Sequence, residues 1–353
     1  MDYVQTTFSS LSAFHSLPLL FEPSQMNVLI VGGAGYIGSH AVRCLIDAGH
    51  QVTVFDNLSY GHRESVPENS LIVGDLADRE QLVRVMKEHN IEAVMHFAAF
   101  ALVGESVENP AIYYRNNVIA AVELLDAMRE AGVNKIVFSS TTATYGEPEL
   151  IPIAETTKQD PINPYGFTKL VFERALADYS AAYGIGYAAL RYFNAAGAHP
   201  SGDIGEDHTP ESHLIPIVLQ VALGQREHIT IFGDDYPTPD GTCIRDYIHV
   251  QDLATAHLSA LQRLTPGEGI RVNLGTGQGT SVRQIVQAAR DVTGHAIPEV
   301  MGQRRAGDPP ELVADATLAR EVLDWTPRYT DLHEIIETAW RWHQSHPNGY
   351  SSR

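Results

Sequence analysis

Short apolar runs alternate with amphipathic segments from Asn27 onward. The runs are apolar almost throughout, which is typical of parallel strands covered by helices on both faces. Strands that alternate with helices in this way predict an α/β fold with a doubly wound parallel sheet. The predicted strands lie at 27–31, 51–55, 71–73, 93–97, 135–139 and 187–192, and the predicted helices at 37–48, 79–89, 110–131 and 165–183.

The pattern changes after Asn194. Residues 195–245 are rich in Gly, Pro and Asp and hold few long periodic segments. Further on, two apolar runs predict strands and two periodic patterns predict helices. The strands lie at 229–232 and 271–274, and the helices near 282–292 and 332–343. We therefore expect a first domain at 26–194, to which later segments return, and a smaller C-terminal α/β domain at 195–350.

Composition restricts the kind of partner that the chain can bind. The 353 residues carry a formal net charge of −19, and 44% of them are hydrophobic, which is typical of a globular protein. A nucleic-acid or anionic-membrane surface needs a basic patch, so neither partner is expected. The two cysteines, Cys44 and Cys243, form no Cys-x-x-Cys pattern, and the 16 histidines show no His-Glu-x-x-His spacing. We expect no disulfide and no metal.

Residues 1–25 differ from the rest of the chain. They are rich in Ser, Thr, Phe and Leu and contain no Lys or Arg, whereas secretory signals need a positive start and transit peptides are Arg-rich. Met26 stands directly before the first predicted strand. We interpret 1–25 as a disordered extension or as the result of a mis-assigned start. We expect a cytoplasmic protein because no apolar run has transmembrane length.

A glycine-rich turn follows the first predicted strand. Gly32, Gly35 and Gly38 stand in a Gly-x-x-Gly-x-x-Gly spacing, and a helix begins directly behind them. Such glycines let the backbone approach a pyrophosphate that faces the helix N-terminus. The turn in this context predicts a Rossmann domain that binds a dinucleotide, and it leaves the smaller C-terminal domain to bind the substrate.

An acidic residue at the next strand end selects the cofactor. Asp56 ends the second predicted strand, where a carboxylate hydrogen-bonds a ribose 2′-hydroxyl and repels a 2′-phosphate. Asn57 and Leu58 follow it instead of an arginine, so NAD is expected rather than NADP. Asp75 ends the third strand. Its side chain could contact the adenine of the cofactor, or it could only cap the following turn.

Tyr165 and Lys169 form a candidate acid–base pair. They stand four residues apart at the start of a predicted helix, and residues at this spacing share one helix face. A phenol has a pKa of about 10, and a nearby cation favours the phenolate. A surface helix pair is the alternative, but the dinucleotide turn upstream favours a dehydrogenase-type site in which the tyrosine moves a proton.

Four hydroxyl side chains stand in a row where the predicted strand 135–139 ends: Ser139, Ser140, Thr141 and Thr142. Ligands of doubly wound sheets gather at the carboxyl ends of the strands. We expect Ser140 or Thr141 to share a hydrogen bond with Tyr165 and the substrate. At least two of the four hydroxyls are expected only to stabilise the following turn.

Further motifs follow in order along the chain. They are His96-Phe97-Ala98-Ala99, Val103-Gly104-Glu105-Ser106, Arg191-Tyr192-Phe193-Asn194, Gly197-Ala198-His199-Pro200-Ser201-Gly202, Phe232-Gly233-Asp234-Asp235-Tyr236-Pro237-Thr238 and Arg245-Asp246-Tyr247-Ile248-His249-Val250. With the glycine turn and the Tyr165–Lys169 pair, they make the chain resemble the UDP-glucose 4-epimerase family of extended short-chain dehydrogenases/reductases, from Met26 to about Tyr350. The C-terminal motifs are the more specific ones, because many dehydrogenases share the others.

The resemblance implies an isomerase that interconverts UDP-galactose and UDP-glucose in galactose metabolism. Tyr165 would take the proton of the sugar 4′-hydroxyl while a hydride passes to NAD, and the hydride would return to the other face of a transient 4-keto sugar. Thr141 stands where many relatives carry serine, and Lys169 would hold the nicotinamide ribose and tune Tyr165.

The resemblance also extends the set of expected binding residues. The expected NAD contacts are Gly32, Gly35, Tyr36, Ile37, Gly38, Asp56, Asn57, Asp75, Leu76, Phe97, Ala98, Asn116, Ser139, Tyr165, Lys169 and Tyr192. The expected substrate contacts are Thr141, Tyr165, Asn194, His213, Leu214, Thr230, Phe232, Arg245, Tyr247, Arg305, Asp308 and Leu312. Within that set Asn194, Arg245 and Arg305 match phosphate-binding positions, and arginine gives charge-assisted phosphate contacts.

Two positions depart from the family pattern. Ala101 stands where some relatives carry a lysine that touches the cofactor, so one anchor for NAD is missing. Leu312 stands at a pocket wall that is tyrosine in glucose-only relatives and smaller in relatives that accept N-acetyl sugars. UDP-N-acetyl sugars therefore stay open as second substrates.

The same fold supports other functions. A 4,6-dehydratase carries Asp-Glu directly after the catalytic hydroxyl, whereas Thr142 and Ala143 follow Thr141 here. A 4-epimerase for UDP-glucuronate or UDP-xylose stays open. A non-catalytic NAD sensor or scaffold typically loses the Tyr/Lys pair, which this chain keeps. The family also implies a homodimer that forms through helix 110–131 and the helix that carries Tyr165.

Overall fold

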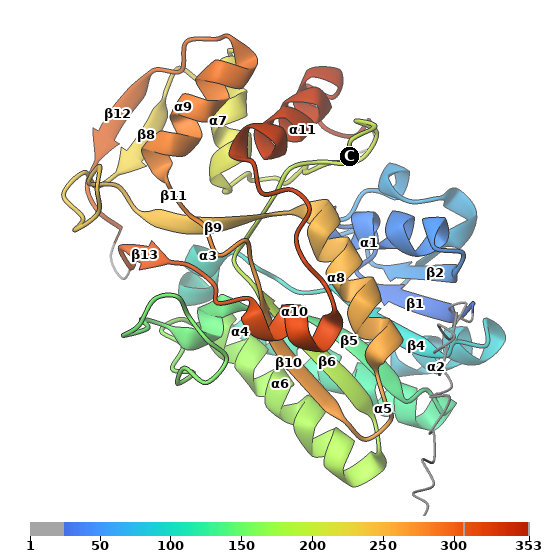
Figure 1. Cartoon of the computed structure of the whole chain (residues 1–353). Helices are drawn as coiled ribbons and strands as arrows, with labels where there is room; N and C mark the ends of the chain where they lie inside the picture. The colour runs from blue at the N-terminus through green and yellow to red at the C-terminus, as the bar shows by residue number, and fades with distance from the viewer. Residues whose placement is uncertain (1–24, 306–307, 352–353) are drawn as a thin grey trace, which may run out of the picture.

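The computed structural model describes residues 25–305 and 308–351. The predicted extension at 1–25 therefore lies outside the described residues, apart from Gln25. A parallel sheet of seven strands forms the larger part of the molecule, in the order β10-β6-β5-β4-β1-β2-β3 (Figure 1). The strands are β1 (Asn27–Val31), β2 (Gln51–Asp56), β3 (Leu71–Val73), β4 (Ala93–His96), β5 (Lys135–Thr141), β6 (Gly186–Tyr192) and β10 (Gly269–Leu274). This is the α/β class that the alternating pattern predicts.

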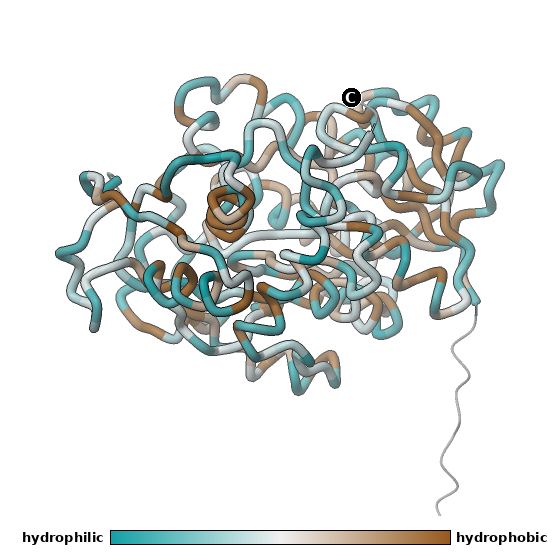
Figure 2. The backbone as a smooth tube through the Cα atoms, turned by 90° about the horizontal axis from the view of Figure 1, so that it is seen from above, coloured by the Kyte–Doolittle hydropathy of each residue, from teal (hydrophilic) through white to brown (hydrophobic). Residues whose placement is uncertain are grey.

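Helices cover both faces of this sheet. On one face α1 (Tyr36–Asp47) packs against α8 (Val250–Arg263), and α10 (Thr317–Leu323) joins the same apolar cluster. On the other face lie α2 (Arg79–Glu88), α5 (Ala121–Ala131) and α6 (Pro164–Tyr183). Figure 2 shows brown hydrophobic stretches along interior segments and teal hydrophilic stretches mainly on outer turns.

A second part of the molecule is built around β9 (Ile244–His249), which pairs with β7 (Asn194–Ala196), β11 (Gly279–Ser281) and β13 (Glu311–Leu312). Next to it, β8 (Ile229–Phe232) pairs in parallel with β12 (Glu299–Gly302). The helices α7 (Leu214–Ala222), α9 (Val282–Thr293) and α11 (Leu332–Ser345) share one apolar cluster with residues of β7, β8 and β9. Figure 1 places this part above the large sheet.

The chain passes between the two parts more than once. Both α8 and β10 follow Asn194 in the sequence, yet β10 is a strand of the large sheet and α8 packs on the face of that sheet. The bounds 26–194 and 195–350 therefore stay a prediction. Among the described residues, no helix has the length and apolar character that crossing a membrane requires.

Several elements differ from the sequence-based expectation. The single helix expected at 110–131 consists of α4 (Pro110–Tyr114), a π-helical segment η3 (Arg115–Ala120) and α5. Within 195–245 the helix α7 was not predicted, because it is apolar almost throughout and so lacks an amphipathic pattern. The short strands β7, β9, β11 and β13 and the helices α3 (Val103–Glu108), α8 and α10 were not predicted.

Candidate active site

The turn between β1 and α1 is built on close backbone contacts. Gly32 has a φ of +77°, and a Cβ on it would lie 2.4 Å from the Ala98 nitrogen. A Cβ on Gly38 would lie 2.2 Å from the Gly32 oxygen. Gly35 caps α1 without a side-chain hydrogen bond, and the first turn of the helix carries no acidic residue. The helix N-terminus is thus suited to a pyrophosphate, because its N–H groups have no side-chain acceptor there.

Gly38→Ala is expected to reduce the amount of NAD that copurifies with the protein to below about a tenth of the wild-type level, because a Cβ cannot fit 2.2 Å from the Gly32 oxygen unless the turn opens. Release of the cofactor by acid and its quantification by chromatography measures this. Gly104→Ala is the matched control, since no atom of the described residues lies within 4 Å of a Cβ there. Wild-type NAD content in Gly38→Ala would contradict the expectation.

Asp56 connects the end of β2 to the glycine turn. One carboxylate oxygen accepts a hydrogen bond from the Ala34 nitrogen at 2.9 Å, and the other accepts one from the Leu58 nitrogen at 2.8 Å. Burial raises the pKa of Asp56. Nearby, the Asn57 amide donates to Asp75 at 3.2 Å, and Asp75 also accepts from the Ala77 nitrogen at 2.9 Å. Asp75 therefore caps its turn and lies beside the end of β2 as well.

The two residues of the candidate acid–base pair come together with the end of β5. The Tyr165 hydroxyl lies near the Thr141 side chain, whose influence opposes the rise that burial causes in the pKa of the tyrosine. The Lys169 Nζ donates to the Ser139 carbonyl at 2.8 Å and lies 4.8 Å from the Phe138 ring centroid. It lies 6.0 Å from the centroid of the Tyr165 ring. Lys169 therefore points at the strand backbone and flanks the ring of Tyr165.

Burial controls the protonation of this pair. It raises the pKa of Tyr165, and the nearby Thr141 side chain only partly opposes the shift. It also lowers the pKa of Lys169 to about 7, against the attraction of Glu173. The expected lowering of the Tyr165 pKa by Lys169 is not seen, because burial is the largest cause of the shift and Lys169 is not among the groups that oppose it. A further positive charge beside Tyr165 is needed to make it a base near neutral pH.

The four hydroxyls at the end of β5 have different partners. Ser139 is hydrogen-bonded to the Tyr192 hydroxyl, and Ser140 donates to the Glu173 carboxylate. Thr142 donates to the Tyr192 carbonyl at 3.3 Å. The Thr141 hydroxyl accepts a hydrogen bond from the Ala143 nitrogen at 3.2 Å. Of the four hydroxyls, it is the one that influences the pKa of Tyr165.

The expected substrate residues of the C-terminal part gather along β9. Arg245 is paired with Asp308, and its neighbour on β13 is Leu312. Asn194 on β7 stands opposite Tyr247. The Arg245 and Asp308 side chains are 13% and 29% exposed, so the pair is reachable from solvent.

Other expected substrate residues lie on separate elements. Phe232 and Thr230 are both on β8, and the Arg305 guanidinium lies 4.1 Å from the Phe232 ring centroid. His213 is the N-cap of α7, and Leu214 is the first residue of that helix. The remaining expected cofactor residues line the large sheet: Tyr36 and Ile37 begin α1, Leu76 follows β3, Phe97 and Ala98 follow β4, and Asn116 lies in η3.

Two supporting groups were missed by sequence reasoning. Glu173 and Arg191 form a buried ion pair behind Ser140, with both side chains 3% exposed. Asn117 in η3 donates to the Thr168 hydroxyl at 3.2 Å and to the Phe100 carbonyl at 3.0 Å. The Asn-Asn pair inside an otherwise apolar helix pattern was the only signal for the second group.

Comparison with known proteins gives one consistent family. The family model described as NAD dependent epimerase/dehydratase family matches residues 28–275. The UDP-glucose 4-epimerase of Halalkalibacterium halodurans is 54% identical over 328 residues, which are 93% of this chain and 98% of that relative.

Solved structures give the same result. The UDP-glucose 4-epimerase of Brucella ovis in complex with NAD has a TM-score of 0.87 at 52% identity, covering 89% of this chain and 97% of its own. The UDP-Glc/GlcNAc 4-epimerase of Campylobacter jejuni has a TM-score of 0.80 at 40% identity, covering 91% of this chain and 99% of its own.

Proposed function

Because this chain belongs to the NAD dependent epimerase/dehydratase family, we propose that it interconverts UDP-galactose and UDP-glucose by NAD-dependent 4-epimerisation. The observation that supports this best is the proximity of Tyr165 to Thr141 at the end of β5, on the same edge of the parallel sheet as the glycine turn. The relatives named UDP-glucose 4-epimerase cover nearly the whole chain, so no large part of it is left to another function.

In this proposal each residue has a defined task. Tyr165 removes the proton of the sugar 4′-hydroxyl and later returns it. Thr141 orients the hydrogen bond between the Tyr165 hydroxyl and the sugar 4′-hydroxyl. Lys169 holds the nicotinamide ribose and adds positive charge beside Tyr165. Bound NAD supplies the hydride acceptor that becomes the donor in the second half of the reaction. The glycine turn, Asp56 and the end of β4 hold that cofactor.

The diphosphate is proposed to lie against Arg245 and Arg305. Arg245 is already paired with Asp308, which keeps the guanidinium in place. The Arg305 guanidinium lies over the Phe232 ring. In this proposal the uracil end of the substrate also packs against the Phe232 ring. Asn194 and Tyr247, opposite each other on β7 and β9, complete this side of the pocket.

The test is to incubate the purified protein with UDP-galactose and no added NAD, and to resolve the products by chromatography. Formation of UDP-glucose would support the epimerase and indicate that NAD copurifies despite Ala101. Absence of conversion even with added NAD would overturn the proposal in favour of another UDP-sugar, such as UDP-glucuronate or UDP-xylose, or of a non-catalytic role.

A parallel incubation with UDP-N-acetylgalactosamine tests the substrate range. Leu312 lies on β13 next to Arg245 and is half-buried, so its size limits the room beside the sugar. We propose that leucine leaves space for an N-acetyl group. Leu312→Tyr should then reduce kcat/KM for the N-acetyl sugar by at least about tenfold more than for UDP-galactose, because added bulk excludes the larger sugar. Equal losses for both sugars would count against a specificity role.

A homodimer is proposed because large apolar side chains are exposed along α3, α4, η3 and the start of α6. They are Val103, Val107, Tyr114, Ile119 and Phe167. An apolar patch shared by neighbouring elements marks an interaction surface.

Light scattering at micromolar concentration is expected to give twice the single-chain mass of 38.7 kDa. Ile119→Asp should shift the mass toward the single chain, because it places a charge on a side chain that is 60% exposed in the lone chain and covered in the dimer. Val300→Asp, on the exposed strand β12, is the matched control and should stay dimeric. A single-chain mass for the wild type would show that the dimer is wrong.

We also propose a cytoplasmic location in galactose metabolism. Cys44 and Cys243 are both free thiols in the described part of the chain, which suits a reducing compartment.

A further inference from the structure

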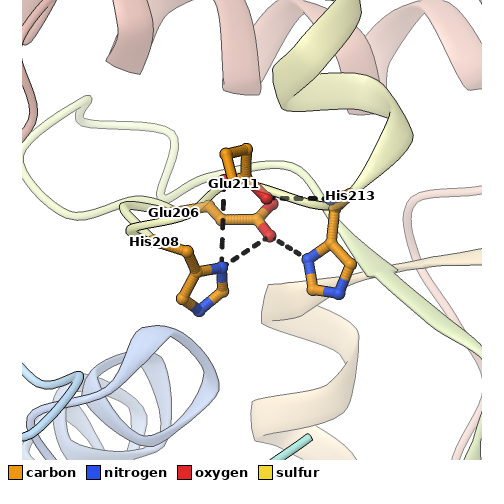
Figure 3. Close-up of side chains that lie close together, drawn as sticks. All are labelled: Glu206, His208, Glu211 and His213. Carbon is orange, nitrogen blue, oxygen red and sulfur yellow. Dashed lines mark hydrogen bonds and ion pairs between the residues drawn. The ribbon is translucent and has the colours of Figure 1, made fainter. Parts of the chain in front are cut away.

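Four side chains with metal-ligating atoms converge in the loop that leads into α7. They are Glu206, His208, Glu211 and His213, and one ligand atom from each lies within 4.8 Å of the others. Figure 3 shows both imidazoles directed at the Glu206 carboxylate, with Glu211 on the opposite side of it. None of the proposed steps of epimerisation uses the first three of these residues.

The spacing of the ligand atoms suits a small four-coordinate ion. The His208 Nδ1 lies 3.3 Å from a Glu206 oxygen and 3.8 Å from a Glu211 oxygen. The His213 Nδ1 is hydrogen-bonded to the same Glu206 oxygen. Zinc holds nitrogen and oxygen ligands at about 2.0–2.2 Å, so the ligands of a tetrahedral site are about 3.3–3.6 Å apart. To hold the ion, His213 Nδ1 would move away from the Glu206 oxygen that it contacts, and the atoms that are farthest apart, within 4.8 Å of one another, would move closer together.

The carboxylates are already held in place by other contacts. The Glu206 and Glu211 side chains are only 4% and 5% exposed. One Glu211 oxygen accepts hydrogen bonds from the nitrogens of Ser212 at 2.7 Å and His213 at 2.8 Å. The Glu206 carbonyl accepts from the Trp342 indole at 3.1 Å, which fastens the loop to α11. The site is therefore organised before any ion arrives, and its other Glu211 oxygen stays directed at His208.

We propose that Glu206, His208, Glu211 and His213 bind one Zn²⁺ ion. Two imidazole nitrogens and two carboxylate oxygens form a donor set that zinc accepts, whereas Mg²⁺ and Ca²⁺ prefer oxygen alone. The sequence-based expectation of no metal depended on the absence of a helical His-Glu-x-x-His spacing. The spacing here is Glu-x-His-x-x-Glu-x-His, and it is a loop that brings the residues together.

The position of the site indicates a structural role for the ion. The His208 ring lies 6.2 Å from the ring of Tyr36, which is the first residue of α1. Trp342 holds the loop on its other side. A zinc ion here would tie the segment before α7 to the start of α1 and to α11, and it would fix the orientation of His213.

The test is a zinc titration of protein first stripped with a chelator, in competition with a chromophoric chelator. The wild type is expected to bind one Zn²⁺ per chain with a dissociation constant below about 1 µM. His208→Gln should bind at least about tenfold more weakly, because it removes one ligand. His228→Gln, at an exposed histidine outside the site, is the matched control and should bind like the wild type. Circular dichroism checks that the His208→Gln protein is folded.

A second measurement identifies the coordination. Co²⁺ added in place of zinc should give the strong visible absorption of a tetrahedral site in the wild type and in His228→Gln, and not in His208→Gln. Failure of the wild type to bind zinc, or equal binding by both variants, would overturn the proposal. Neither readout depends on turnover, so the result is independent of the proposed epimerase activity.

Discussion

Replacing Tyr165 by phenylalanine is expected to lower kcat by about 10²–10⁴-fold, which is the usual contribution of a positioned acid–base group. The hydroxyl is the only atom removed, and its neighbour in the protein is the Thr141 side chain. The ring stays, so the packing around Lys169 and the fold are preserved. KM and the amount of bound NAD should change little, since the lost interaction is made at the reacting proton.

Steady-state kinetics with UDP-galactose measures the effect, and the NAD released from denatured protein checks the cofactor. Tyr183→Phe is the matched control, because this tyrosine is 52% exposed at the end of the same helix and has no part in the site. Its turnover should equal that of the wild type. Retention of wild-type kcat by Tyr165→Phe would mean that another group removes the proton.

Replacing Glu173 by alanine is expected to lower the free energy of unfolding by about 3–5 kcal/mol, because it leaves a buried guanidinium without its counter-charge. Arg191 donates to the Glu173 carboxylate at 2.9 Å from Nε and at 2.6 Å from a terminal nitrogen. Its remaining terminal nitrogen donates to the Tyr145 hydroxyl at 2.8 Å. Glu173 also accepts from Ser140, so the change removes several hydrogen bonds at once.

Urea denaturation followed by circular dichroism measures this loss, compared at fixed NAD content. Glu130→Ala is the matched control: its partner Arg79 lies 3.3 Å away at the surface, and such pairs contribute about 0–1 kcal/mol. The double variant Glu173→Leu/Arg191→Met should recover most of the stability, because it removes both buried charges. A loss below about 1 kcal/mol in Glu173→Ala would show that Arg191 finds other compensation.

The first half of the fold follows from local pattern. The apolar runs 28–31 in β1 and 136–138 in β5 have no polar face, and only a sheet covered on both sides buries them. The glycine turn needs small residues at fixed positions, and a Cβ at Gly38 has no room. These features are local in sequence, so the sequence alone predicts them.

The second half depends on pairings between distant residues. Asn194 on β7 faces Tyr247, and Arg245 on β9 has Leu312 as its neighbour. A strand of two or three residues is too short to show an alternation of apolar and polar residues. Whether it forms therefore depends on the strand with which it pairs. The buried Glu173–Arg191 pair likewise joins residues on α6 and β6 that only the fold brings together. The charge of Lys169 alone predicts a lowered pKa for Tyr165, whereas burial, which depends on the fold, is the largest cause of the pKa shifts of both residues.

The order of strands in the large sheet also affects how the protein is made. β6 ends at Tyr192 and is covered on its outer edge by β10, which ends at Leu274. A nascent chain that has emerged only as far as Asn194 holds six strands of the sheet with the edge of β6 bare, and unpaired edges invite association with other chains. The nucleotide-binding half therefore cannot be completed ahead of the rest, and synthesis through this interval is the stage at which chaperone protection matters most.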